Sequence, residues 1–155
     1  MTTKTQLKSK IQELEAELQS FKSQLNNYQE ITLETAKVGD TLADGSIFLQ
    51  KENGLALLVA PKSTEVTCSW SPEFPEVYTK LKEQGFNPSQ WFVPTKEQLQ
   101  LAYKKLKNQF SASSYWSSTE INATFACLVN FNNGTTFSFL KTLTCCVRTF
   151  RCVTY

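Results

Sequence analysis

Seven apolar residues near the N-terminus follow the 4-3-4-3-4-3 spacing of a heptad repeat, and this spacing constrains the fold more than any other feature of the sequence. They are Leu7, Ile11, Leu14, Leu18, Phe21, Leu25 and Tyr28. Such a repeat keeps one side of a helix apolar along its length, so it predicts a coiled coil over residues 4–31. An amphipathic helix that folds back onto its own domain is the alternative.

The positions that flank this apolar stripe carry opposite charges. In the heptad register, Lys10 at g precedes Glu15 at e, and Glu17 precedes Lys22 in the same way. This arrangement favours a parallel homo-oligomer. A large side chain such as Phe21 at d fits poorly in a tight dimer, so we expect a parallel homotrimer, with a dimer as the alternative. The coil is only a little over three heptads long, so we expect contacts between the attached domains to support it.

After Thr32 the apolar pattern changes from a helical repeat to short alternating runs bounded by turn signals. The order of elements predicts an α+β domain over residues 37–155, behind a coiled-coil oligomerisation stalk at residues 1–32. The expected elements are a β-hairpin of residues 46–49 and 55–59, a helix within 72–85, a helix that begins after Thr95 with Gln98 completing a capping box, strands at 125–131 and 135–139, and a final strand at 147–153.

Five amino acids nearly disappear from the sequence after residue 120. Lys, Glu, Gln, Met and Trp fill 40 of the first 120 positions, but in residues 121–155 only Lys141 belongs to this group, where about a dozen would be expected. A codon of the form NNC cannot encode any of the five, and random replacement of both adenines in AAC (Asn) codons produces the alphabet that is found. The pattern therefore predicts rewriting of this segment at the codon level. The alternative is a β-rich segment that simply lacks long polar side chains.

Several motifs resemble the Lcl C-terminal domain family, which has a C-type lectin fold of the formylglycine-generating-enzyme-like variant. The resemblance covers roughly residues 37–155, with one departure, Phe92-Val93 where the family more often has Arg-Leu. The motifs that carry it are WFVPTKEQLQLAY (91–103), SYWSSTE (114–120), NFNNG (130–134) and VRTFRCV (147–153), together with VGDTLADGSIF and NGLALLVAPK in the expected opening hairpin.

The same fold and ending occur in variable proteins of diversity-generating retroelements, including phage tropism determinants. In these systems a reverse transcriptase miscopies adenines of a template RNA and the product is written into the 3′ end of the gene. The resemblance therefore implies that the tail is a hypervariable ligand-binding segment, the region in which the restricted alphabet was found. The implied variable, outward-facing residues are Ile121, Ala123, Thr124, Phe125, Cys127, Leu128, Thr135, Phe137, Phe139, Leu140, Thr142, Leu143, Thr144, Cys145 and Cys146.

The remaining residues of the tail divide into a scaffold and an ambiguous group. We expect strand alternation to let one face of a strand vary while the other stays fixed. An untouched AAC codon still encodes Asn, so Asn122, Asn130, Asn132 and Asn133 can belong to either group. The expected scaffold residues are Trp116, Ser117, Ser118, Val129, Phe131, Gly134, Val147, Arg148, Arg151 and Val153.

Composition argues against catalytic and metal-binding functions. The chain has no His, which is the commonest general base and zinc ligand, and its five Cys form no CxxC pair. Formylglycine-generating enzymes share the implied fold and use a cysteine pair, but here Cys145 and Cys146 are adjacent, with no acid or His nearby in the sequence to activate a thiolate. Residues 121–155 contain no Asp or Glu to bind calcium. We expect no enzyme activity, no cofactor and no metal site.

Exposure of the variable set would create an apolar patch of Phe125, Leu128, Phe137, Phe139, Leu140 and Leu143, which is larger than a monomer normally exposes. We therefore expect a macromolecular ligand, a protein or a cell-surface molecule, bound by several copies of the chain at once. A structural or virion-assembly adaptor with the same fold and no variable binding is the alternative.

Charge and hydropathy limit the other partners and the location. The net charge of +2 is too small to indicate nucleic acid, and no 18-residue apolar stretch is present to insert into a membrane. The sequence shows no signal peptide, so we expect synthesis in the cytoplasm. A phage virion and a bacterial cell are both compatible with this expectation.

Overall fold

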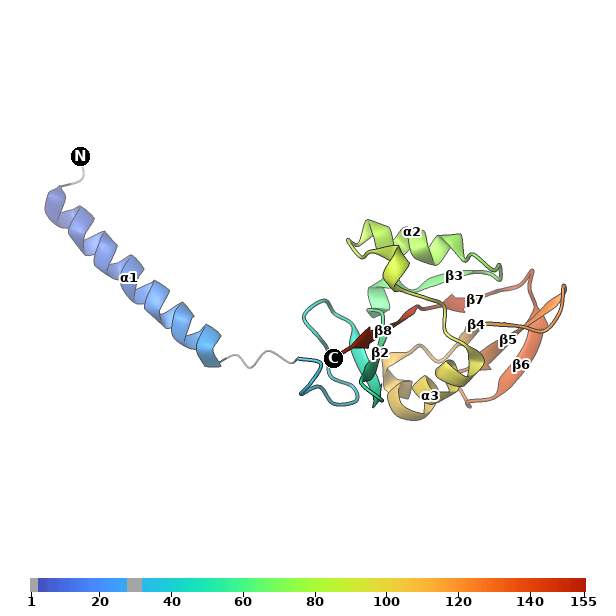
Figure 1. The fold of residues 1–155 in the computed structure, drawn as a ribbon. Helices are drawn as coiled ribbons and strands as arrows, with labels where there is room; N and C mark the ends of the chain where they lie inside the picture. Colours follow the sequence, from blue (N-terminus) through green and yellow to red (C-terminus); the bar gives the residue numbers. More distant parts are fainter. Residues whose placement is uncertain (1–2, 28–31) are drawn as a thin grey trace. The chain divides into compact units, whose positions relative to one another are not determined.

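The computed structural model describes residues 3–27 and 32–155, and the chain divides into two compact units, Met1–Glu30 and Ile31–Tyr155. The first unit contains one helix, α1 (Lys4–Asn27), so the helix expected in this region is confirmed (Figure 1). Leu25 lies in α1, and Tyr28 lies outside the described residues. The apolar positions with described side chains are each between 51% and 64% exposed in the single chain: Leu7, Ile11, Leu14, Leu18 and Phe21.

The second unit is a mixed α+β domain, as the sequence predicts. Its strands form a three-stranded sheet of order β1-β2-β8 and a five-stranded sheet of order β3-β7-β4-β5-β6, in which only the β4–β7 pairing is parallel. The elements are β1 (Ile47–Glu52), β2 (Leu55–Val59), η1 (Lys62–Thr64), β3 (Val66–Ser69), α2 (Pro75–Glu83), η2 (Pro88–Gln90), α3 (Lys96–Leu106), η3 (Lys107–Gln109), β4 (Ser114–Glu120), β5 (Phe125–Asn130), β6 (Thr136–Leu140), β7 (Thr144–Val147) and β8 (Phe150–Thr154).

Local sequence signals explain where α3 begins and where α2 begins and ends. The predicted capping box of α3 is confirmed, because the Thr95 hydroxyl accepts the Gln98 amide at 3.2 Å and the Gln98 side chain accepts the Thr95 amide at 2.9 Å. Helix α2 is shorter than the expected range of 72–85. It starts at Pro75, whose missing amide proton is tolerated in a first turn, and it stops before Gly85, which has φ +86°.

Two buried clusters cover opposite faces of the five-stranded sheet. On one face, Leu99 and Ala102 of α3 pack in a cluster with residues from both sheets. This cluster includes the rings of Tyr115 and Phe131. On the other face α2 and the segment before it pack against Trp116 and its neighbours. Figure 1 shows α2 and α3 on opposite sides of the central strands, with β6 at the outer edge of the sheet. The inner strands are therefore covered from both sides.

Two features of the strands differ from the sequence prediction. Strand β3 was not expected, and the expected final strand at 147–153 is divided between β7 and β8, which belong to different sheets. Arg148 lies at the break and is only 1% exposed. Its Nε donates to the Ala60 carbonyl at 2.8 Å and its Nη1 to the Gln109 carbonyl at 2.5 Å. These bonds hold the Arg148 side chain inside the domain at the point where the chain passes from one sheet to the other.

Candidate binding face

Strand β6 is one of the two edge strands of the five-stranded sheet, and it is exposed on both of its sides. Phe137, Ser138, Phe139 and Leu140 are consecutive and all exposed. The expected alternation between an inward and an outward face is therefore not found in β6. Neither buried cluster includes a residue of β6, because the packed side chains of both helices lie against the inner strands. Edge strands of this kind offer unpaired backbone groups as well as side chains.

Two turns extend the exposed surface from one end of β6. One connects β4 to β5 at residues 121–124, and the other connects β6 to β7 at residues 141–143. They lie side by side because Phe125 pairs with Leu140 in the sheet, and because the Lys141 amide donates to the Thr124 carbonyl at 3.0 Å. Residues far apart in the sequence are thus brought into one surface.

Eleven of the fifteen positions expected to vary are exposed, and Cys146 is half-buried. The eleven, which we call the exposed set, are Ile121, Ala123, Thr124, Phe125, Thr135, Phe137, Phe139, Leu140, Thr142, Leu143 and Thr144. Three expected surface residues are buried instead, with exposures of 3%, 3% and 6%: Cys127, Leu128 and Cys145. The expectation of an outward position is wrong for these three.

The sheet explains why these three residues are inside. Leu128 lies directly opposite Trp116 on β4 and packs in the cluster beneath α2. Cys145 lies opposite Cys68 on β3 in the same cluster. Cys127 belongs to β5, an inner strand, and its carbonyl accepts the Ser117 hydroxyl at 2.6 Å. The restricted alphabet does not separate core from surface, because small and apolar residues serve both.

The apolar members of the exposed set form what we call the apolar face: Ile121, Phe125, Phe137, Phe139, Leu140 and Leu143, each between 36% and 49% exposed. Phe137 and Phe139 lie on the α2 side of the sheet, since they pair with Leu128 and Ala126, whereas Leu140 points to the other side. The face therefore wraps around the edge. A hollow of about 290 Å³ opens on the Phe137 side, lined by Ser114, Leu128, Asn130, Phe137, Ser138 and Phe139.

Three of the four ambiguous asparagines form turns. The Asn122 side chain accepts the amides of Thr124 and Phe125, both at 2.9 Å. The Asn130 side chain accepts the Asn132 amide at 2.8 Å. Similarly, the Asn133 side chain accepts the amide of Thr135 at 3.0 Å and its hydroxyl at 2.6 Å. Asn is favoured in such turns because its side chain imitates a backbone carbonyl, so these three have a structural role as Asn.

Most of the expected scaffold residues are buried. Trp116, Val129 and Val147 are fully buried, and the Trp116 indole donates to the Cys68 carbonyl at 3.1 Å. Gly134 is required for space as well as for its φ of +78°, because a Cβ there would lie 2.4 Å from the Tyr103 ring. Ser118 is exposed, in contrast, although its amide is held by the Pro94 carbonyl.

Burial favours the neutral form of three thiols. Burial raises the pKa of Cys68 and of Cys145 to about 11, and burial also raises the pKa of Cys146. A neutral thiol is a poor nucleophile. Within residues 3–27 and 32–155, no group of three or more His, Cys, Asp or Glu side chains is placed to hold a metal ion. In the same part of the chain, no helix combines the length and apolar character needed to cross a membrane.

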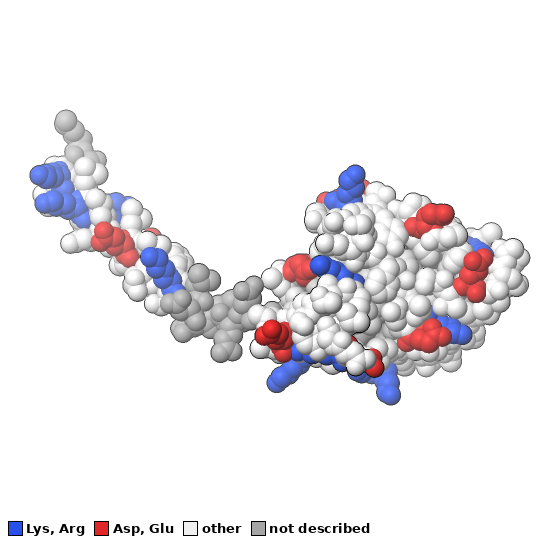
Figure 2. All heavy atoms as spheres, in the orientation of Figure 1, with Lys and Arg blue, Asp and Glu red and all other residues white. Residues whose placement is uncertain are grey.

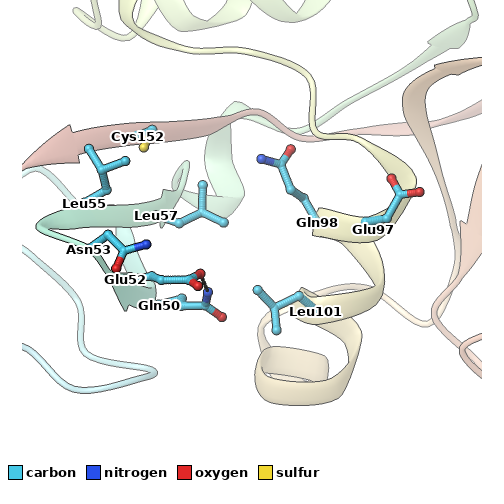
Figure 3. A pocket seen from close by; sticks show the side chains of 9 residues that line it. All are labelled: Gln50, Glu52, Asn53, Leu55, Leu57, Glu97, Gln98, Leu101 and Cys152. Carbon is cyan, nitrogen blue, oxygen red and sulfur yellow. Dashed lines mark hydrogen bonds between the residues drawn. The ribbon is translucent and has the colours of Figure 1, made fainter.

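A second hollow lies away from the apolar face, between the β1–β2 hairpin and α3 (Figure 3). It has a volume of about 370 Å³ and combines leucines with polar and acidic side chains. Its lining residues are Gln50, Glu52, Asn53, Leu55, Leu57, Glu97, Gln98, Leu101 and Cys152. None of the positions expected to vary contributes to it. Figure 2 shows basic and acidic side chains scattered over the visible side of the second unit, without a large area of either sign.

Comparison with known proteins gives no independent assignment. No protein-family model matches this chain, and no curated protein matches it.

Proposed function

We propose that this chain is a non-enzymatic ligand-binding protein whose C-terminal segment is diversified by adenine mutagenesis from a retroelement. The observation that carries the proposal is the coincidence of the restricted alphabet with an exposed surface. The restricted codon alphabet begins at Ile121, and eleven of the fifteen positions expected to vary in this segment are exposed, on β6, in the turns beside it and at the ends of β5 and β7. Rewriting at such positions changes what the protein binds and leaves the packed clusters intact.

The proposal includes a C-type lectin fold of the formylglycine-generating-enzyme-like variant for the second unit. The mixed α+β architecture is compatible with it, and so is the pairing of β8 with the β1–β2 hairpin, which brings the C-terminal strand back to the start of the domain. The motifs that carry the resemblance lie at structural positions. Thr95 caps α3, and Trp116 fills the cluster beneath α2.

The ligand we propose is a macromolecule, either a protein or a cell-surface molecule. Six large apolar side chains on β6 and beside it favour a partner that covers them, and aromatic residues such as Phe137 and Phe139 are typical anchors of protein interfaces. The neutral thiols of Cys68 and Cys145 favour binding over nucleophilic catalysis. The scattered charges favour no nucleic-acid partner.

We further propose that α1 assembles the chain into a parallel homotrimer, with a dimer as the alternative. The support is the row of apolar side chains on α1, which are at least half exposed in the single chain. An oligomer presents several faces to one surface and so converts weak single contacts into strong attachment. Light scattering of the full chain should give about three times 17.6 kDa, and Leu18→Asp should give a monomer.

The test of the proposed function is the DNA around the gene. A nearby near-copy of the 3′ end that differs from it only at adenines, next to a reverse-transcriptase gene, is the expected result. The codons of the exposed set should also end in C. Absence of both features would leave a structural or virion-assembly adaptor with the same fold, because such an adaptor does not require the NNC alphabet.

A further inference from the structure

Lys141 is the one residue of the tail that departs from the NNC alphabet, and it lies in the turn between β6 and β7, within the candidate binding face. Its neighbours Leu140, Thr142 and Leu143 are exposed, but the Lys141 side chain is only 15% exposed. A lysine in a surface turn normally extends into water. Its burial therefore requires a structural explanation.

The Lys141 ammonium is enclosed between two partners from other parts of the chain. Its Nζ lies 4.5 Å from the centroid of the Trp70 ring, and it pairs with the Glu120 carboxylate at 2.7 Å. The Glu120 side chain is half exposed, so the ion pair alone contributes little. Trp70 is only 8% exposed, and a cation held over a ring that is shielded from water is attracted more strongly.

The backbone of Lys141 makes two further links. Its amide donates to the Thr124 carbonyl at 3.0 Å, and its carbonyl accepts the Trp70 amide at 2.9 Å. Trp70 is fixed in turn, because its indole donates to the Ser117 carbonyl at 2.8 Å. Lys141 thus joins the 121–124 turn, its own turn and the segment that follows β3.

We propose that Lys141 is the fixed positioning residue of the binding face. This inference rests on the proposed function, because a positioning residue has meaning only where the surrounding residues change. Lys141 holds the two variable turns at a constant separation while Leu140, Thr142 and Leu143 are rewritten. The face then changes its chemistry and keeps its backbone frame, which limits the ordering that each new ligand must impose on binding.

Amide hydrogen exchange of the full chain without ligand tests this proposal. Lys141→Met keeps the aliphatic stem and removes the charge, and Lys141→Arg keeps a cation. Thr142→Met is the matched control, since it places the same side chain at the next, exposed position. In Lys141→Met we expect the amides of residues 70 and 141 to exchange roughly ten-fold faster or more, as loss of a shielded cation–π contact implies. In Thr142→Met and in Lys141→Arg, the exchange rates of the same two amides should stay within about two-fold of those in the natural chain.

The location of the change separates positioning from general stabilisation. Faster exchange confined to the two turns and Trp70, with core amides such as Val129 and Phe150 unchanged, is the expected result. Equal acceleration in the core would overturn the proposal, and so would an unchanged rate at residues 70 and 141. Neither result depends on a ligand, so each leaves the proposed function standing.

A second measurement covers the case in which Lys141→Met does not fold. A library randomised at residues 140–143 is selected for folded protein by resistance to protease. We expect Lys or Arg to dominate at 141 and many residue types to survive at 140, 142 and 143. Equal tolerance at all four positions would overturn the proposal.

Discussion

Strands β5 and β6 are hydrogen-bonded neighbours that draw on the same restricted alphabet, yet one is buried and the other is exposed. In β5 four consecutive residues from Ala126 to Val129 are buried, and in β6 four consecutive residues from Phe137 to Leu140 are exposed. Position in the sheet causes the difference, because β5 is an inner strand and β6 is an edge. An edge strand can accept new side chains that an inner strand would have to pack.

The largest effect should come from the side chain that the buried strands pack against. Trp116 is fully buried, so Trp116→Ala should lower the free energy of unfolding by about 3–5 kcal/mol in urea denaturation. Phe139 lies 6.1 Å from the Trp116 ring but is 37% exposed. Phe139→Ala is the control and should cost about 1 kcal/mol, since only part of its surface leaves water. Similar losses in both variants would mean that β6 belongs to the core.

The contrast between β5 and β6 can also be measured at two residues that face each other across the strands. Leu128 on β5 lies opposite Phe137 on β6. Leu128→Asn should cost about 3 kcal/mol, because a polar group enters the cluster without a partner. Phe137→Asn should cost about 1 kcal/mol or less, since the new side chain stays hydrated. Urea denaturation of the two variants measures both values. Equal costs would contradict the assignment of β6 to the binding face.

Buried and exposed cysteines should also differ in the reactivity of their thiols. Cys145 is buried with its pKa raised from 9.0 to about 11, whereas Cys152 is exposed. Two pKa units reduce the Cys145 thiolate about a hundred-fold at pH 8, before access is considered. An aromatic disulfide reagent should therefore label Cys152 at least about a hundred times faster than Cys145 in the folded chain. Equal rates at pH 8, read by peptide mass spectrometry, would show that Cys145 is open to solvent.

The smallest effect should be at the exposed turn. Thr142→Asn restores the residue that an AAC codon encodes, and it should change the free energy of unfolding by about 0.5 kcal/mol or less. The same denaturation experiment measures it. A loss of several kcal/mol would mean that the turn cannot tolerate rewriting.

The sequence predicted those features that depend on local signals. The heptad spacing predicted helix α1, and the Thr95 and Gln98 pair predicted the start of α3. Strand β3 was missed because it is short and because its pairing partner β7 is distant in sequence. The buried position of Arg148 depends on the carbonyls of Ala60 and Gln109, which no local pattern reveals.

The site was predicted in part for the same reason. Composition identified the rewritten segment but could not place Cys127, Leu128 and Cys145 inside, since sheet order decides burial and composition does not contain it. Lys141 is a further signal in the sequence. It is the only exception to the alphabet in residues 121–155, and in the structure its ammonium contacts Trp70 and Glu120.

Deep sequencing of the 3′ end of this gene in a population that carries it would show which residues of the tail are rewritten. We expect variation at the exposed set, with Leu128, Val129 and Lys141 constant. Variation spread equally over β5 and β6, or no variation anywhere in residues 121–155, would contradict this expectation.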